Sequence, residues 1–298
     1  MTIAPVKITH RRMTPMEWTR QLAWRHLVGI LAVTFALFPL IWMASAAFDP
    51  LGLVGAQTLI PSHPGLGNFR RLFGNVDYPY AIWFRNSLLI ASVNAVLQLA
   101  IGASAAYALS RFRFRGRKTT LLSILVVQMF PQLLAAVALF LMMAKIGESI
   151  PFLGLGSPFA LIAIFAGGAL GINAWMLKGF YDTIPSEIDE SAKVDGASHA
   201  QIFIKIILPL ARPIFAVIGL LSFIGTMNEF LLTSVILGGK PHAITLAVGM
   251  QQFIDGKYDK NWGPFAAGSL IASIPVIIVF QFLQRFIVSG LTAGSTKG

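Results

Sequence analysis

The 298-residue sequence contains no cysteine, which excludes disulfide bonds and cysteine-ligated metal sites. Charged residues are also scarce, at 12%, where a soluble globular domain has about 25%. Acidic residues are fewer than basic ones, 12 against 23, and 56% of all residues are hydrophobic. With a mean hydropathy of +0.72, this composition predicts an integral membrane protein.

Catalytic signatures are missing as well. No Gly-x-x-x-x-Gly-Lys-Ser/Thr motif is present, so the chain carries no P-loop for ATP hydrolysis, and there is no His-Glu-x-x-His zinc motif. The five histidines are scattered over loops and the ends of apolar runs. A membrane hydrolase would need paired acids, or a nucleophile and a base, at membrane depth. We therefore expect no catalytic site, no metal and no cofactor in this chain.

The formal net charge of +11 could suggest nucleic-acid binding. The basic residues, however, stand in short clusters beside apolar runs, which is typical of loops at an anionic membrane face. No nucleic-acid-binding motif accompanies them. We expect membrane lipid as a partner, and no nucleic acid.

Long uncharged runs predict membrane spans, because about 20 apolar residues cross a bilayer and backbone groups inside lipid must be satisfied within a helix. Pro and Gly residues at the start of the fourth run predict a turn there. The first run is longer than the apolar part of a signal peptide, about 7 to 15 residues, so we expect it to be retained. The six predicted spans are 27–48, 86–110, 119–144, 150–177, 213–237 and 262–284.

Basic residues predict the orientation of these spans. Sixteen of the 23 lie before the first span, between the second and third, between the fourth and fifth, or after the sixth. The positive-inside rule makes that side cytoplasmic. Both termini are then cytoplasmic, and the loops 49–85 and 238–261 lie outside.

A charged segment, 186–210, separates the fourth and fifth spans. Ser186 and Asp189 have the spacing of a helix start, and Gly196 permits a tight turn. A second apolar stretch then leads into Pro209. The pattern predicts two short helices joined at a glycine, either as a connector in the lipid interface or as a docking element.

The spacing Glu190-x-Ala192, Gly196, Ile206 and Leu208-Pro209 matches the "EAA" signature of ABC importer permeases, with Ser191 where alanine is usual. The segments 83–87, 128–131, 228–230, 245–252 and 290–294 further resemble MalG-type permeases for maltose and maltodextrins. The resemblance implies an all-α integral membrane protein with the type I importer fold and a cytoplasmic coupling helix. It also implies three parts: a cytoplasmic segment 1–26, a permease domain 27–288 and a cytoplasmic tail 289–298.

The resemblance also implies the partners. These are a second, MalF-like permease, a MalK-like ATPase homodimer that binds ATP and Mg²⁺, and an extracytoplasmic sugar-binding protein at a bacterial inner membrane. Maltose or maltodextrin is the expected cargo, with trehalose or another oligosaccharide as the alternative. The residues expected to dock on the ATPase are Glu190, Ser191, Ala192, Asp195, Gly196, Ile206, Leu208 and Pro209.

Each of the other polar groups has a functional and a structural interpretation. Glu229, with Asn228 beside it, could line the permeation path or a gate, or bond to a neighbouring helix. The pair Asn94 and Gln98 could bind sugar, but we favour contacts between helices. Resemblance implies that the outer loop contacts the binding protein through Gly249, Gln251, Gln252 and Tyr258, although it could be a plain connector.

An ion-coupled secondary transporter is the alternative from another class. It would predict ionisable residues in several spans and internal repeats. Only Glu229 lies well inside a predicted span, and no repeat is evident.

Overall fold

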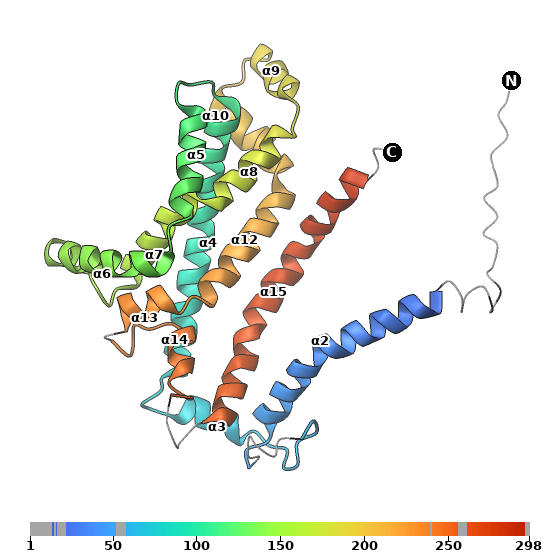
Figure 1. The fold of residues 1–298 in the computed structure, drawn as a ribbon, viewed down its shortest axis with the longest axis vertical. Helices are drawn as coiled ribbons and strands as arrows, with labels where there is room; N and C mark the ends of the chain where they lie inside the picture. Colours follow the sequence, from blue (N-terminus) through green and yellow to red (C-terminus); the bar gives the residue numbers. More distant parts are fainter. Residues whose placement is uncertain are drawn as a thin grey trace.

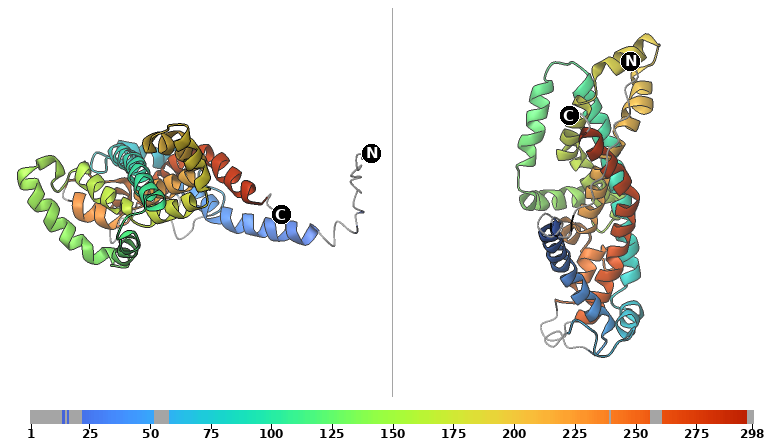
Figure 2. Two further views of the ribbon diagram at one scale, coloured as in Figure 1. Left: turned by 90° about the horizontal axis from the view of Figure 1, so that it is seen from above. Right: turned by 90° about the vertical axis from the view of Figure 1, so that its right-hand side faces the viewer.

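The computed structural model describes residues 14, 16, 22–51, 58–238, 240–255 and 261–295, and all regular structure in these ranges is helical (Figure 1). The central helix is α4 (Tyr80–Arg111), which packs against α8 (Ile172–Asp182) and α12 (Arg212–Met227). The long helix α15 (Trp262–Ser295) packs against α12 and α2 (Trp24–Phe48). Figure 2 shows α2 on the opposite flank from the remaining long pair, α5 (Arg117–Gln128) and α6 (Gln132–Ser149).

Shorter elements complete the chain. They are α3 (Gly67–Gly74), η3 (Pro151–Leu153), α7 (Pro158–Gly167), η4 (Gly168–Leu170), α9 (Ser186–Val194), α10 (His199–Ile202), η5 (Phe203–Ile207), α11 (Leu208–Leu210), α13 (Leu231–Leu237) and α14 (Leu246–Gln251). The turn predicted at the start of the fourth run is confirmed by η3 and the loop that follows it.

Fewer than six single helices in the described ranges are long enough to span a membrane. In the described ranges, four helices are long and apolar enough to cross a membrane, namely Trp24–Phe48, Tyr80–Arg111, Pro158–Asp182 and Trp262–Ile287. A fifth is reached only if the pair His199–Leu210 and Arg212–Met227, bent by 78°, counts as one span. The six-span count is therefore not confirmed.

The two remaining predicted spans are each broken into shorter helices. The run 119–144 divides into α5 and α6 at Pro131, which has no N–H to donate and disfavours a helical conformation in the residue before it. The run 213–237 divides into α12 and α13 at residues 228–230. No charged residue marks the first break, and Glu229 marks the second.

The ends of the molecule agree with the charge pattern. The link between α4 and α5, together with α9 and α10, lies at one end, and the C-terminal half of α15 points towards that end (Figure 1). The helices α3 and α14 lie at the opposite end (Figure 1). The basic link between α4 and α5 and the basic segment that carries α9 and α10 therefore share one end (Figure 1), whereas most of the N-terminal basic cluster lies outside the described residues.

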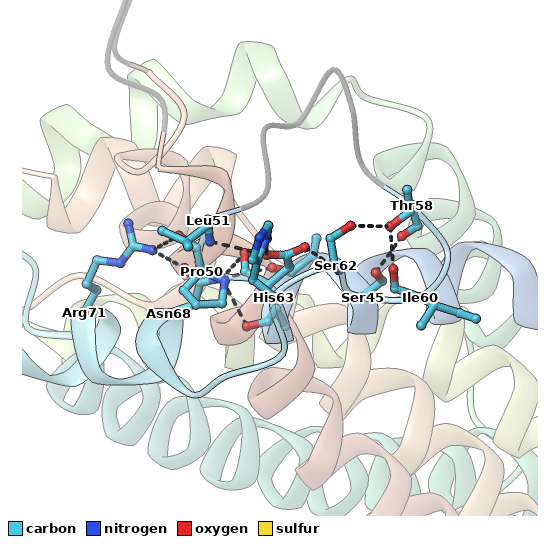
Figure 3. Close-up of polar contacts among 12 residues, drawn as sticks. Ser45, Pro50, Leu51, Thr58, Ile60, Ser62, His63, Asn68 and Arg71 are labelled. Carbon is cyan, nitrogen blue, oxygen red and sulfur yellow. Dashed lines mark hydrogen bonds and ion pairs between the residues drawn. The ribbon is translucent and has the colours of Figure 1, made fainter.

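The loop after α2 is fixed by polar contacts to α3 (Figure 3). The Asn68 side-chain amide donates to the carbonyl oxygens of Ala46, Ala47 and Asp49, at 3.0 to 3.2 Å. Burial acts to raise the pKa of the Asp49 carboxyl, but backbone N–H donors, among them that of Ser62 at 2.9 Å, outweigh it and lower the pKa. One amide thus satisfies the last carbonyls of α2.

Candidate functional site

The segment 186–210 forms two short helices that meet at Gly196, as the sequence predicts. The φ angle of Gly196 is +82°, a region that L-amino acids rarely adopt. Its N–H donates to the Lys193 carbonyl at 3.0 Å, and the Ala197 N–H donates to the Ala192 carbonyl at 2.9 Å. This pair of bonds is a Schellman motif, which ends α9 and turns the chain back.

The second helix begins at a capping box that the sequence analysis missed. The Gln201 N–H donates to Ser198 Oγ at 3.3 Å, and the Ser198 N–H donates to Gln201 Oε1 at 2.8 Å. The helix then widens into the π-helical stretch η5 ahead of Pro209, which lacks an N–H. The Ser-x-x-Gln spacing at 198–201 was the signal available in the sequence.

The residues expected to dock on the ATPase divide by exposure. Glu190, Ser191, Asp195 and Gly196 are exposed, on α9 and at its C-terminal end. Ala192 is buried on the opposite side of α9, and Ile206, Leu208 and Pro209 are half-buried. The segment therefore presents a polar surface outwards and an apolar surface to the helices beneath it.

The apolar surface of the segment packs on the ends of α4 and α8. Ala192, Ile202 and Ile207 are buried in one cluster with Tyr107 of α4 and Tyr181 of α8. The rings of Tyr107 and Phe203 lie 4.8 Å apart between centroids. A connector floating in the lipid interface would not bury these side chains, so the segment is part of the folded body.

The helix begins at Ser186, the start that the sequence predicts, but the side-chain cap expected there is absent. The cap position is Pro185, and no side chain caps the helix, because Ser186 is already its first helical residue. Asp189 instead pairs with Arg111 at the end of α4, with 2.7 Å between Asp189 Oδ2 and Arg111 Nε. Local spacing could not reveal this contact, because Arg111 is distant in the sequence.

The amides of Asn94 and Gln98 form contacts between helices, which confirms the favoured reading. Asn94 Nδ2 donates to Thr226 Oγ1 of α12 at 2.5 Å, and Asn173 Nδ2 of α8 donates to Gln98 Oε1 at 2.6 Å. Ser222 of α12 also donates to Gln98 Oε1, at 3.0 Å. The network joins α4, α8 and α12 where all three pack together.

Glu229 lies at the break between α12 and α13. Its carboxylate accepts hydrogen bonds from the N–H groups of Leu232 and Thr233, at 2.7 and 2.9 Å, and from Thr233 Oγ1 at 2.7 Å. It therefore caps the N-terminus of α13 on its own chain segment, where a negative group is favoured. No bond from Glu229 to a neighbouring helix is found in the described ranges.

Asn228 is exposed beside Glu229, and it faces a cleft between α12, α14 and α15. The cleft has a volume of about 400 Å³ and is lined mainly by apolar side chains. Its polar lining residues are Asn228, Ser269 and Ser273. This mixture of an apolar wall and a few hydroxyl and amide groups can accommodate a hydrated, hydroxyl-bearing solute.

The loop between α13 and α14 is hydrogen-bonded to the N-terminal half of α4. Trp83 Nε1 donates to the Pro241 carbonyl at 2.9 Å, and the Asn86 amide donates to His242 and Ile244 carbonyls at 3.0 and 3.1 Å. A Cβ on Gly249 would lie 2.1 Å from the Trp83 ring. The segments 83–87 and 245–252, quoted separately in the sequence, thus touch each other.

The residues expected to contact the binding protein differ in exposure. Gly249 is buried, and Gln251 and Gln252 are half-buried, with Gln251 Nε2 donating to Asp255 Oδ1 at 2.7 Å. Tyr258 lies outside the described residues.

Comparison with known proteins matches residues 98–292 to the family described as "Binding-protein-dependent transport system inner membrane component". The galactooligosaccharide permease GanQ of Bacillus subtilis is 40% identical over 273 residues, 91% of this chain and 94% of the relative. The maltodextrin permease MdxG of the same organism is 40% identical over 262 residues, covering 88% and 91%. The maltose/maltodextrin permease MalG of Escherichia coli is 36% identical over 284 residues, covering 92% and 95%.

A solved structure has a similar fold. It is a bacterial ABC transporter involved in the import of the acidic polysaccharide alginate, matched with a TM-score of 0.73. The match covers 92% of this chain and 99% of that one, at 24% identity.

Proposed function

This chain belongs to the family of binding-protein-dependent transport system inner membrane components, and we propose that its cargo is maltose or maltodextrin. It is a multi-pass inner-membrane protein and the permease subunit of an ABC sugar importer, in which a partner ATPase hydrolyses ATP. The ion-coupled alternative considered from composition is therefore set aside. The proposed cargo rests on one observation: similarity to MdxG and MalG extends over about nine-tenths of the chain.

Galactooligosaccharide is the second candidate cargo, because GanQ matches at the same 40% identity as MdxG. The segments 245–252 and 290–294 favour the maltose type, since their likeness is to MalG-type subunits. A trehalose cargo has no relative of that name among those described above.

The proposed partners are a second, MalF-like permease, a MalK-like ATPase dimer that binds ATP and Mg²⁺, and an extracytoplasmic sugar-binding protein. We place the segment 186–210 and both termini on the cytoplasmic side, where the exposed Glu190, Ser191 and Asp195 face the ATPase. Support for this placement comes from the shared end of the basic loops (Figure 1). On the opposite side, the loop that carries Gln251 and Gln252 meets the binding protein.

The test of this function combines purification with uptake. Affinity purification of this chain in mild detergent should bring down an ATPase and a second permease. In a strain lacking the gene, the wild-type copy should restore uptake of labelled maltotriose but not of labelled galactotriose or trehalose. Restored galactotriose uptake would replace the cargo, and uptake that survives loss of the ATPase would overturn the whole assignment.

Glu229 gives a test of the proposed permeation path. Replacing Glu229 with alanine removes three accepted hydrogen bonds from the start of α13, which costs about 0.5–2 kcal/mol for a helix cap. The break beside the cleft then loses its fixed shape, and we expect maltotriose uptake to fall about fivefold or more, which corresponds to about 1 kcal/mol. Uptake should be measured at equal amounts of membrane-inserted protein.

Glu148→Ala is the matched control, because Glu148 is an exposed glutamate whose partner is the neighbouring Lys145. It should leave uptake unchanged. Equal uptake by Glu229→Ala and Glu148→Ala would contradict a role of Glu229 in the permeation path.

A further inference from the structure

The Arg111 side chain joins the end of α4 to the segment that leads into α9. Its Nε lies 2.7 Å from Asp189 Oδ2, and its Nη2 donates to the Ile184 carbonyl at 3.0 Å. The Arg111 side chain is 11% exposed and that of Asp189 is 7% exposed. One guanidinium therefore holds both α9 and the turn that precedes it.

This ion pair is unusually dependent on both of its members. Asp189 Oδ1 and Arg111 Nε are both buried, and neither makes a hydrogen bond with the residues that the structure describes, so the two members compensate each other mainly through their opposite charges. Removing one member of a buried pair leaves an uncompensated charge, which is far more disruptive than loss of a surface pair. The nearby Asp182 has its own partners, Ser110 and Lys178, and does not compete for Arg111.

The chain that connects α9 to α12 is not one continuous α-helix. It passes through the left-handed Gly196, the π-helical stretch η5 and the 78° bend before α12. The route through Arg111 is direct, because it leads from α9 to the last residue of α4 with no intervening turn. Since α4 packs against both α8 and α12, a displacement carried by this route reaches the centre of the fold.

We propose that Arg111 is a positioning residue that fastens α9 to α4 through Asp189, so that the two helices move as one body when the ATPase displaces α9. The proposal rests on the proposed function, in which α9 receives the ATPase. In many such transitions, packed elements move together as a rigid body between two positions. Without the pair, movement of α9 is absorbed at Gly196 and η5, and ATP hydrolysis no longer drives the spans.

The absence of cysteine in this chain allows a direct distance measurement. Spin labels at Val194→Cys in α9 and Ser104→Cys in α4, both exposed positions, would be measured in the complete transporter with cysteine-free partners. The wild-type background should give the same narrow distance distribution with and without ATP. Arg111→Glu should broaden and shift that distribution, and the charge-swapped Arg111→Glu/Asp189→Arg chain should restore it.

Two matched controls separate the pair from a general charge effect. Arg113→Glu makes the same substitution as Arg111→Glu two residues further along the chain. Glu187→Arg reverses an acidic charge in the same turn of α9 as Asp189. Both residues are exposed. Neither should alter the distances. Binding-protein-stimulated uptake per ATP hydrolysed should fall about tenfold in Arg111→Glu, within the range of about 5–150-fold typical of allosteric coupling.

Three results would overturn the proposal: unchanged distances in Arg111→Glu, a wild-type distance that shifts with ATP, or loss of ATPase co-purification in Arg111→Glu. The last would make Arg111 a folding residue only. Failure of the proposed function is a separate result, because no ATPase would then co-purify with the wild type. In that case the nucleotide-free distances of Arg111→Glu and Glu187→Arg still decide whether the pair fastens α9.

Discussion

Gly196→Asp should abolish ATP-driven sugar uptake while leaving the protein inserted in the membrane. A Cβ at Gly196 would meet nothing within 4 Å, so the substitution causes no clash. Its cost combines backbone strain at a φ of +82°, up to about 1–2 kcal/mol for an L-residue and less for aspartate, with a negative charge at the C-terminal end of α9, which the helix dipole disfavours. That cost can be relieved by opening the Schellman turn, which changes the direction in which α9 is presented. The segment would persist, but its polar surface would no longer match a partner.

Charge and strain can be separated at the same position. Gly196→Asn has nearly the same shape as the aspartate without its charge, and asparagine tolerates left-handed backbone better than most residues. Gly196→Val adds strain without charge, because β-branched residues are severely disfavoured there. We expect uptake to decrease from Asn to Asp and Val. Immunoblots of membranes should show equal amounts of all three, and uptake at the wild-type rate in Gly196→Asp would contradict the docking role of this turn.

Gly249→Ala should strongly destabilise the end of the protein where α3 and α14 lie (Figure 1). The new Cβ would lie 2.1, 2.2 and 2.7 Å from three atoms of the Trp83 ring. That ring is fully buried, donates to the Pro241 carbonyl and packs edge-on against Phe253, so it has no room to withdraw. Overpacking of this kind costs about 1–3 kcal/mol, and we expect the upper end of that range. Thermal unfolding in detergent measures it.

A compensating variant makes this prediction specific. Trp83→Leu removes the ring, so Gly249→Ala should cost at least about 1 kcal/mol less in that background, a coupling typical of residues in contact. Gly225→Ala is the matched control, because Gly225 lies in α12 with open space around its missing side chain. That variant should be neutral or more stable, by up to about 1 kcal/mol, since alanine favours helix. Equal effects of Gly249→Ala and Gly225→Ala would contradict the packing argument.

The structure of the segment 186–210 was predictable where local chemistry decides it. Gly196 ends α9 because glycine alone accepts a positive φ without strain, and that preference is visible in the sequence. The start of α9 was predicted but its cap was not, because Asp189 pairs with Arg111 instead of capping its own helix. A pattern confined to neighbouring residues contains no information about that distant partner.

Composition predicted where most membrane helices lie, but not where two of the apolar runs divide into shorter helices. Uncharged runs located α2, α4 and α15 because burial in lipid demands apolar residues throughout. Apolar content does not show where a helix divides, and proline alone does not decide it either: the helix breaks at Pro131, whereas α2 and α15 continue through Pro39 and Pro275. The contact of Gly249 with Trp83 was also hidden, although both residues lie in segments quoted from the sequence, because only the fold brings them together.

The apolar stretch of α2 is exposed along most of its length. Its C-terminal part packs against α15, and Asn68 donates to the carbonyls of Ala46 and Ala47 near its end. The helix is made before Asn68 during synthesis. It can therefore enter the bilayer and form alone, since its internal hydrogen bonds need no help from later residues. The carbonyls of Ala46 and Ala47 gain their partner only after Asn68 has been made, so insertion of α2 does not depend on these contacts.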